Sequence, residues 1–457
     1  MDINNVKSVY FIGAGGIGMS ALVRFFLANG KLVAGYDRTA TPLTEQLIRE
    51  GADIHYEEDI HLIPSDFMDA QSTLVVYTPA IPSDHAEWTF FRENGFEIMK
   101  RSQALGLLTK QGKGLCVAGT HGKTTTSTMI AHLLHQSHVG CNAFLGGISQ
   151  NYKTNLLLSS QSPYVVVEAD EFDRSFHWLT PYISVVTATD ADHLDIYGDK
   201  ASYLESFAHY TSLISPDGVL IVHEGLELKP RLQPGTRCYG YGMEKGDFHA
   251  SNIRIGNGEI VFDFVSPLGN ISDVQLGVPV LINIENGIAA MATAQMCGAT
   301  SDEIRAAMAS FRGVERRFDF KVKTDELVVL SDYAHHPEEL RQSILSMRAL
   351  FEGRKITGIF QPHLYSRTRD FYHEFADSLS LLDEVILIDI YPAREKPIEG
   401  VTSRLIYDNL RPGIEKSLCD KHDLLRFLSD KSFDVVMTLG AGDLDGLVPD
   451  ICTVLTK

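Results

Sequence analysis

The chain has 457 residues, of which 44% are hydrophobic and 22% charged, and its formal net charge at pH 7 is -19. This length exceeds what one hydrophobic core usually serves, so we expect several domains. The negative charge argues against a general nucleic-acid-binding protein, which needs a basic surface to neutralise phosphates. A ligand that carries phosphate must therefore be held by a local site.

No apolar run approaches the roughly 20 residues that span a bilayer, and the first residues lack the basic start and apolar stretch of a signal peptide. We therefore expect a cytoplasmic protein without membrane insertion, either a monomer or a homodimer. The cysteines are expected to be reduced and mostly buried, because they lie far apart and form no CxxC pair that would indicate a zinc site. They are Cys116, Cys141, Cys238, Cys297, Cys419 and Cys452.

From Ser8 the chain alternates between predicted strands and helices, in the order βαβαβ, with strands at 8–12, 32–36 and 73–81. This order is typical of the opening of a parallel, doubly wound sheet. The first turn contains GxGxxG, and its glycines permit a tight turn and a close approach of a diphosphate to the helix amino end. Asp37 closes the second strand, where a ribose-binding acid belongs. By itself the pattern also fits a nicotinamide dehydrogenase or a bare turn. Its glycines are Gly13, Gly15 and Gly18.

A second series begins with a predicted strand at 114–119 and a helix at 123–135, and between them stands GTHGKT. Lys123 would neutralise phosphates, backbone N–H groups from Gly119 to Thr124 would wrap them, and the Thr124 hydroxyl would contact Mg2+. The motif is not a full Walker A sequence, because Val117 stands where that motif has glycine. The alternative is a glycine-lysine turn that merely opens a helix.

Acidic residues follow two further predicted strands of this segment, at 164–170 and 182–190. Glu168 ends the first, and a strand-end carboxylate beside a phosphate loop can hold Mg2+ directly or through water. Behind it, any of Asp170, Glu171 and Asp173 could simply cap the strand. After the second strand stands His193 among Asp190, Asp192 and Asp195; it is either a metal or phosphate contact or a structural histidine. Alternating residues around 252–264 predict an antiparallel extension.

A third series of predicted strands, at 326–334, 356–362, 384–392 and 434–442, forms another parallel α/β unit. Ligands of open parallel sheets bind at the carboxyl ends of the strands, and arginines there suit a carboxylate or phosphate. Arg369 is the residue of this group that best fits ordinary solvated surface. The group comprises Asp332, His335, His336, His363, Arg367 and Arg369.

The motifs, in this order, resemble the Mur ligase family, the ATP-dependent amide-forming enzymes of bacterial peptidoglycan synthesis. The resemblance covers the whole chain. It is carried by GAGGIGMSAL, GTHGKTTT, EADEFDRSF, DADHLDIY, RRFDF, DYAHHPEE and QPHLYSRTRD.

This resemblance implies an α/β protein of three domains. Residues 1–107 would form a Rossmann-like UDP-sugar-binding domain, 108–314 a central P-loop ATPase-like domain that binds ATP, and 315–457 a C-terminal Rossmann-like domain that binds the amino acid. The motifs are most similar to the branch that joins L-alanine to the lactyl carboxylate of UDP-N-acetylmuramate. In that reaction ATP phosphorylates the carboxylate, and the amine attacks the acyl phosphate.

The resemblance also implies roles for individual residues. Lys123, Glu168, His193 and Arg317 would be catalytic, and Thr124, Glu168 and His193 would contact Mg2+. The UDP-sugar and the amino acid would be bound by Gly13, Gly15, Gly16, Ile17, Gly18, Asp37, Thr78, Ala80, His336, His363 and Arg367. ATP would be bound by Gly119, Thr120, His121, Gly122, Lys123, Thr124, Thr125, Asn283, Asn286, Arg316, Arg317 and Asp332.

Two residues depart from the family pattern. Ile282 replaces a histidine that contacts adenine, and Leu364 replaces an arginine after the histidine of QPH, so the clamp on the amino-acid carboxylate rests more on Arg367. Three other functions fit part of the sequence. A ligase that attaches a whole recycled tripeptide to the same UDP-sugar shares the first motifs but reads differently at QPHLYSRTRD. A dehydrogenase leaves GTHGKT unexplained, and a nucleotide switch would show no ATP turnover.

Overall fold

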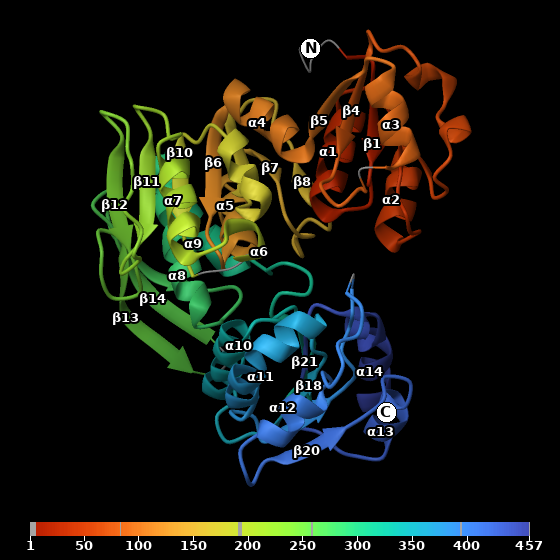
Figure 1. The fold of residues 1–457 in the computed structure, drawn as a ribbon. Helices are drawn as coiled ribbons and strands as arrows, with labels where there is room; N and C mark the ends of the chain where they lie inside the picture. Colours follow the sequence, from red (N-terminus) through yellow and green to blue (C-terminus); the bar gives the residue numbers. More distant parts are fainter. Residues whose placement is uncertain (1–5, 83, 191–193, 257–258, 394, 457) are drawn as a thin grey trace. The chain divides into compact units, whose positions relative to one another are not determined.

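The computed structural model describes residues 6–82, 84–190, 194–256, 259–393 and 395–456. The chain forms two compact units, which are considered separately (Figure 1). Unit 1 comprises Met1–Ser251, Phe264–Ser272 and Asn286–Ser310, and unit 2 comprises Asn252–Asp263, Asp273–Glu285 and Phe311–Lys457. Within the described residues, no helix combines the length and apolar character needed to cross a bilayer.

The first sheet of unit 1 is fully parallel, with strand order β3-β2-β1-β4-β5. Its central strand, β1, is completely buried, so the sheet needs helices on both faces, as parallel sheets do. The strands are β1 Ser8–Ile12, β2 Leu32–Tyr36, β3 Asp53–His55, β4 Thr73–Tyr77 and β5 Glu97–Lys100. The helices are α1 Ile17–Ala28, α2 Pro42–Glu50, α3 Ala86–Glu93 and α4 Arg101–Gln111, with short 3-10 turns at Ile60–Leu62 and Ser65–Phe67.

The second sheet of unit 1 has the order β12-β11-β10-β6-β9-β7-β8 and is parallel except for β8. Its strands are β6 Lys113–Ala118, β7 Asn142–Phe144, β8 Leu156–Leu157, β9 Tyr164–Ala169, β10 Ile183–Val186, β11 Val219–His223 and β12 Arg237–Tyr241. The helices are α5 Lys123–His135, α6 Leu194–Tyr197, α7 Lys200–Thr211, α8 Ile282–Met296 and α9 Ser301–Ser310, with a 3-10 segment at Phe172–Trp178. Because β6 lies between β10 and β9, the loops after these three strands meet at one edge.

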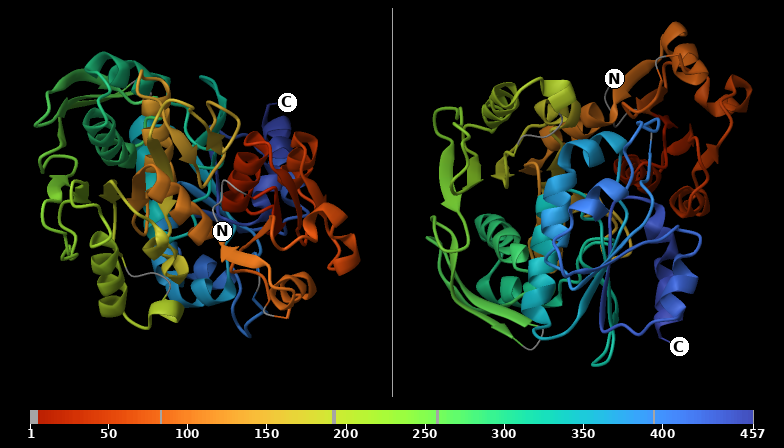
Figure 2. Two further views of the ribbon diagram at one scale, coloured as in Figure 1. Left: turned by 90° about the horizontal axis from the view of Figure 1, so that it is seen from above. Right: turned by 60° about the horizontal axis from the view of Figure 1, so that its bottom comes forward.

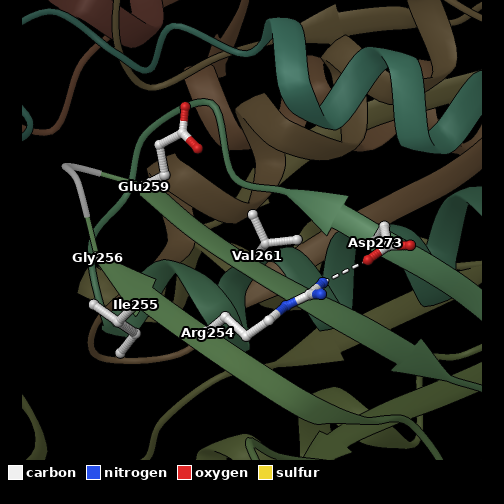
Figure 3. Close-up of a pocket in the computed structure, with 6 residues that line it drawn as sticks. All are labelled: Arg254, Ile255, Gly256, Glu259, Val261 and Asp273. Carbon is white, nitrogen blue, oxygen red and sulfur yellow. Dashed lines mark hydrogen bonds and ion pairs between the residues drawn. The ribbon is translucent and has the colours of Figure 1, made fainter.

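A separate three-stranded sheet has the order β13-β14-β15. It comprises β13 His249–Gly256, β14 Glu259–Val265 and β15 Ile271–Gln275. Figure 3 shows its open surface groove, where Arg254 pairs with Asp273 at 2.5 Å and Val261 lies between them. No residue that the sequence assigns to a site lines this groove.

The sheet of unit 2 has the order β16-β17-β21-β18-β19-β20 and is parallel except for β16. Figure 2 shows the chain from two further directions, with the C-terminal part of this unit in blue. Its strands are β16 Asp319–Lys323, β17 Val328–Asp332, β18 Ile356–Phe360, β19 Glu384–Leu387, β20 Glu415–Leu418 and β21 Val435–Leu439. The helices are α10 Pro337–Leu350, α11 Tyr365–Leu379, α12 Arg404–Asn409, α13 Leu424–Ser429 and α14 Val448–Leu455, with a 3-10 turn at Asp443–Leu447.

The predicted strands exist, but several features differ from the sequence-based expectation. The strand predicted to run to residue 81 ends at Tyr77, and the last unit has an antiparallel edge, β16, that was not expected. Short strands such as β3 and β8 were missed because they carry too few apolar residues to show a period. The expectation of mostly buried cysteines is wrong: all six are free, but only Cys116 and Cys141 are buried.

One face of the first sheet buries a carboxyl group. Glu87, at the start of α3, is fully inaccessible and accepts a hydrogen bond of 2.7 Å from the Tyr10 hydroxyl. The ring of His55 lies 3.5 Å from the other carboxyl oxygen. Burial raises the pKa of Glu87 to about 7. The folded protein therefore binds this proton more tightly than the unfolded chain.

We predict that Glu87→Gln removes a pH-dependent part of the stability. The contribution of the Glu87 proton is fully present below the ordinary pKa of 4.5 and is lost as the pH rises through about 7. The variant should therefore melt at a higher temperature than the wild type at pH 8, by the equivalent of up to about 3 kcal/mol. This difference in stability between the variant and the wild type should disappear at pH 5. Thermal melting across this range measures it, with the exposed Glu93→Gln as control; a gap independent of pH would contradict the prediction.

Candidate active site

The glycine-rich turn after β1 is shaped by its neighbours within the first sheet. Gly13 has φ of +89°, which favours glycine, and a Cβ there would lie 2.4 Å from the Thr78 side chain. Gly15 donates its backbone N–H to Asp37 over 2.7 Å. The predicted site residues Gly13, Gly15, Asp37 and Thr78 are therefore brought together at the carboxyl edge of this sheet.

Helix α1 begins directly after this turn, with Gly16 at its N-cap. Gly16 has no side chain to cap this end, although the first N–H groups of a helix need partners. Gly16 and Ile17 are exposed there, and Ala80 is exposed in the loop after β4. The geometry is that of an anion-binding helix amino terminus.

The loop between β6 and α5 has the form of a phosphate cradle. Gly119 and Gly122 have φ of +139° and +82°, so the chain turns sharply into α5 at Lys123. A Cβ on Gly119 would meet the Thr187 hydroxyl at 2.1 Å. Thr187 itself donates hydrogen bonds to the carbonyls of Ala118 and His121. The loop is thus held open by its own glycines and by the residue after β10.

Lys123 is paired inside this loop with a buried carboxylate. Its Nζ lies 2.7 Å from Glu171, whose side chain is 2% exposed, and it also donates to the Gly119 carbonyl over 2.5 Å. Burial lowers the pKa of Lys123, but the carboxylates of Glu171, Asp170 and Glu168 outweigh it and the net pKa is raised. Lys123 is therefore a permanent cation. Sequence reasoning left Glu171 as a possible strand cap; its pairing with Lys123 carried no sequence signal beyond proximity to Glu168.

Glu168 is the penultimate residue of β9. It lies beside the loop, because β9 pairs with β6 and Glu168 is in register with Val117. One carboxylate oxygen accepts the Gly146 N–H over 3.1 Å. A Cβ on Gly146 would lie 2.2 Å from that oxygen, so the glycine leaves room for the acid. Thr124 lies in the first turn of α5, at the same edge.

The other side of the loop is anchored by residues after β10. The Thr120 hydroxyl donates to the Asp190 carbonyl over 2.8 Å and lies 2.9 Å from the Tyr203 hydroxyl. The His121 ring lies 3.8 Å from the Asp190 carboxylate. His193 and Asp192 lie outside the described residues, as does the side chain of Asp195.

Helix α8 carries the two asparagines predicted to contact a nucleotide. Asn286 accepts a hydrogen bond of 3.1 Å from the Thr126 hydroxyl of α5, and its oxygen would lie 2.9 Å from a Cβ on Gly122. It therefore touches the phosphate loop from within unit 1. Asn283 belongs to unit 2, is 5% exposed, and donates to the Val278 carbonyl over 3.2 Å.

Charged residues at the junction of β5 and α4 reach the acidic segment after β9. Arg101 pairs with Asp170 at 3.0 Å, and Lys100 pairs with Asp173 at 2.8 Å. Both acids lie in the same segment as Glu171. The carboxyl edge of the first sheet is thereby tied to that of the second, and sequence reasoning did not single out either cation.

In unit 2, Arg316 and Arg317 both lie against the Tyr333 ring, at 4.8 and 4.9 Å from its centroid. Arg316 is engaged with the loop after β21, through Asp445 at 3.1 Å. Arg317 has a looser partner, Glu339, at 3.9 Å.

The predicted nucleotide contact Asp332 ends β17 in the same unit. Its carboxylate accepts hydrogen bonds from the Ser343 hydroxyl, over 2.6 Å, and from the Phe318 N–H, over 3.3 Å. Burial raises the pKa of Asp332. These contacts place the residue at the carboxyl edge and give it a structural role there.

The histidines and Arg367 lie after β17 and β18 of that sheet. The rings of His335 and His363 are 6.0 Å apart. Burial lowers the pKa of His335; Glu339 opposes this effect and nearby Arg367 adds to it. His336 caps α10 and its ring lies 5.5 Å from Phe371. His335 therefore belongs to the His363 and Arg367 cluster, whereas the prediction had selected His336.

Arg369 is the last residue of the predicted group of unit 2, and Leu364 is the residue that departs from the family pattern there. Leu364, at the N-cap of α11, has φ of +70°, a backbone conformation that is strained for leucine. Its N–H donates to the Tyr391 carbonyl over 3.0 Å. Arg369 is exposed and pairs with its neighbour Asp370, as expected for solvated surface.

Comparison with known proteins agrees with this geometry. Family models match in order: Mur ligase family, catalytic domain over 8–113, Mur ligase middle domain over 117–294, and Mur ligase, glutamate ligase domain over 316–442. A Phocaeicola vulgatus protein named UDP-N-acetylmuramate–L-alanine ligase is 72% identical over 457 residues, covering 100% of both chains. A Parabacteroides distasonis protein of the same name is 59% identical over 458 residues, covering 100% of this chain and 99% of its own.

Solved structures show the same similarity. The crystal structure of a UDP-N-acetylmuramate–alanine ligase from Thermotoga maritima is 27% identical and covers 98% of each chain, with a TM-score of 0.82. A murein peptide ligase from Psychrobacter arcticus shares the fold at 20% identity, with a TM-score of 0.66 over 98% of each chain. The full-length match to relatives, together with the three family models in order, shows that this chain belongs to the Mur ligase family.

Proposed function

We propose that the chain is an ATP-dependent ligase that joins L-alanine to the lactyl carboxylate of UDP-N-acetylmuramate, a step in peptidoglycan precursor synthesis. The relatives that match it from end to end carry that name. The reaction proceeds through an acyl phosphate, because a carboxylate is a poor acyl donor until its oxygen is phosphorylated. ADP and phosphate are the other products.

The observation that carries the proposal is the phosphate loop with Lys123 held beside Glu168 and Glu171 at one sheet edge. A nicotinamide dehydrogenase has no use for this second cradle. In the ligase, Lys123 exchanges Glu171 for the β- and γ-phosphates of ATP. Its charge then offsets the repulsion between the γ-phosphate and the incoming carboxylate.

The residues at this edge fit Mg2+. No cluster of three or more histidine, cysteine or acidic side chains that could hold a metal occurs in the described ranges. Mg2+ suits such a place, because it usually keeps waters and binds through one or two protein groups plus substrate phosphates. We propose Thr124 and Glu168 as those groups and His193 as a contact near the transferring phosphoryl group. When bound, Mg2+ would neutralise phosphate charge.

The remaining assignments follow the family pattern. We propose that the turn from Gly13 to Gly18, with Asp37, Thr78 and Ala80, binds the UDP-sugar, and that Asn283, Asn286 and Asp332 serve ATP. Arg317 is the better candidate than Arg316 for ATP phosphate, because Arg316 already holds Asp445. We propose that His336, His363 and Arg367 bind L-alanine. We add His335 to them because its ring lies 6.0 Å from that of His363 and Arg367 contributes to lowering its pKa.

The boundaries of the three domains, at 1–107, 108–314 and 315–457, are part of this proposal, as is action in the cytoplasm as a monomer or homodimer. Closure of the domains around the substrates would keep water away from the acyl phosphate, which water would otherwise hydrolyse.

We predict that phosphate release from ATP requires both UDP-N-acetylmuramate and a small L-amino acid, with alanine the best. A phosphate-release assay with each amino acid in turn measures this. Equal turnover with a preformed tripeptide would move the assignment to a tripeptide-recycling ligase. Hydride transfer from NADH to any substrate would overturn the ligase proposal.

We predict opposite effects of Glu171→Gln on the free and nucleotide-bound protein. Losing the carboxylate leaves Lys123 buried without its counter-ion, so the free protein should melt at a lower temperature. Binding of ATP restores a partner, so ATP without added metal should bind about three- to tenfold more tightly, as calorimetry would show. Asp173→Asn removes the same charge from the same segment but from a pair with Lys100, and should not tighten ATP binding. Loss of ATP binding in Glu171→Gln would contradict the counter-ion role.

We predict that Glu168→Ala and His193→Ala impair different steps of the reaction. Glu168→Ala should weaken binding of Mg2+-ATP itself. His193→Ala should leave that binding largely unchanged but slow acyl phosphate formation about 100-fold or more, the usual loss for one charge-stabilising contact in a transition state. Rapid-quench measurement of the acyl phosphate, with ATP affinity measured separately, distinguishes them. A normal rate in His193→Ala would make His193 a structural histidine.

A further inference from the structure

Arg101 lies where the two phosphate-binding edges of unit 1 meet. It is the first residue of α4 and directly follows β5, so it emerges at the same sheet edge as the glycine-rich turn after β1. Its Nη2 donates to Asp170 over 3.0 Å. Asp170 in turn neighbours Glu171, the counter-ion of Lys123.

The other end of the Arg101 fork lies against the glycine-rich turn. A Cβ on Gly18 would be 2.0 Å from Nη1 of Arg101 and 3.1 Å from its Cζ. Glycine at position 18 therefore leaves room for this guanidinium, and a Cβ there would displace the flexible Arg101 side chain from the first turn of α1. The side chain of Arg101 remains 25% exposed, so it is not sealed inside the protein.

The acidic residues near Arg101 require a cation at the place where the UDP-sugar would bind. One short segment of this acidic protein carries four acids, Glu168, Asp170, Glu171 and Asp173. In the proposed function, Lys123 binds ATP and so does not neutralise the UDP-sugar. A substrate that carries a diphosphate and a carboxylate would be repelled on entering. A planar guanidinium binds either group through paired hydrogen bonds.

We propose that Arg101 is a substrate-positioning residue that binds an oxyanion of the UDP-sugar, and that Asp170 holds it in place until the substrate arrives. This inference rests on the proposed function, because it takes the sugar nucleotide as the ligand of the turn after β1. Arg101 lies against Gly18, which belongs to the turn proposed to bind the diphosphate, so the diphosphate is the expected oxyanion. The lactyl carboxylate offers the same chemistry, and the experiment separates the two.

Lys100 provides a matched control. It too is a cation that joins the start of α4 to the acidic segment, through Asp173 at 2.8 Å, and its side chain is 34% exposed. A role limited to tying the two sheets together would be shared by both residues. A substrate role is expected of Arg101, because its guanidinium group supplies the atoms nearest to a Cβ on Gly18 in the glycine-rich turn.

The test measures binding of three ligands to the full chain by calorimetry: UDP-N-acetylmuramate, UDP-N-acetylglucosamine and Mg2+-ATP. We expect Arg101→Gln to weaken UDP-N-acetylmuramate binding about 10- to 100-fold and to leave ATP binding within about twofold. Arg101→Lys should recover part of the loss. Lys100→Gln should change UDP-sugar binding by less than about threefold. An equal loss for UDP-N-acetylglucosamine, which lacks the carboxylate, identifies the diphosphate; a loss confined to UDP-N-acetylmuramate identifies the carboxylate.

Two outcomes would overturn the inference. One is Arg101→Gln binding both UDP-sugars as tightly as wild type, and the other is Lys100→Gln losing as much affinity as Arg101→Gln. Thermal melting of each variant checks that it is folded, and Arg101→Lys supplies the comparison if Arg101→Gln is not. Failure of the proposed function is distinct, because wild-type protein would then bind no UDP-sugar at all.

Discussion

The buried ion pair between Lys123 and Glu171 is the interaction on which the site depends. A lysine taken out of water needs a counter-ion, and in the described structure Glu171 supplies it over 2.7 Å. The pair holds Lys123 in the loop, and phosphate can replace Glu171 as its partner without leaving the lysine unpaired. The strands and helices around the pair place it at the carboxyl edge of the second sheet, where this exchange of partners can occur.

Parallel strands make that arrangement possible. In the second sheet β6 lies between β9 and β10, so the acid of β9 and the anchoring threonine after β10 flank the loop from opposite sides. The glycine-rich turn of the first sheet occupies the same kind of edge. Through Arg101 and Lys100 the two edges are fixed to one acidic segment, so in the proposed function a UDP-sugar at the first turn would extend toward the second loop.

Structural features that depend on a local sequence pattern could be predicted. Helix α5 has the bounds that were predicted, because glycine and lysine mark its start. Pairings between distant residues could not be predicted: neither Arg101 with Asp170 nor Thr126 with Asn286 leaves a periodic signal. For the same reason the sequence could not show which of His335 and His336 lies near His363, since both follow one strand and only the conformation of the chain decides which ring faces His363.

The structure gives a second physical reason for the glycines of these motifs. Motif reasoning explains them by close approach of a ligand to the backbone. Here Gly15 leaves space for Asp37, Gly18 for Arg101 and Gly146 for Glu168. Each missing side chain admits a charged group of the protein to the edge where ligands bind. A substitution such as Gly18→Ala would thus displace a charge as well as narrow a turn, so a loss of affinity there would report on Arg101 as much as on the backbone.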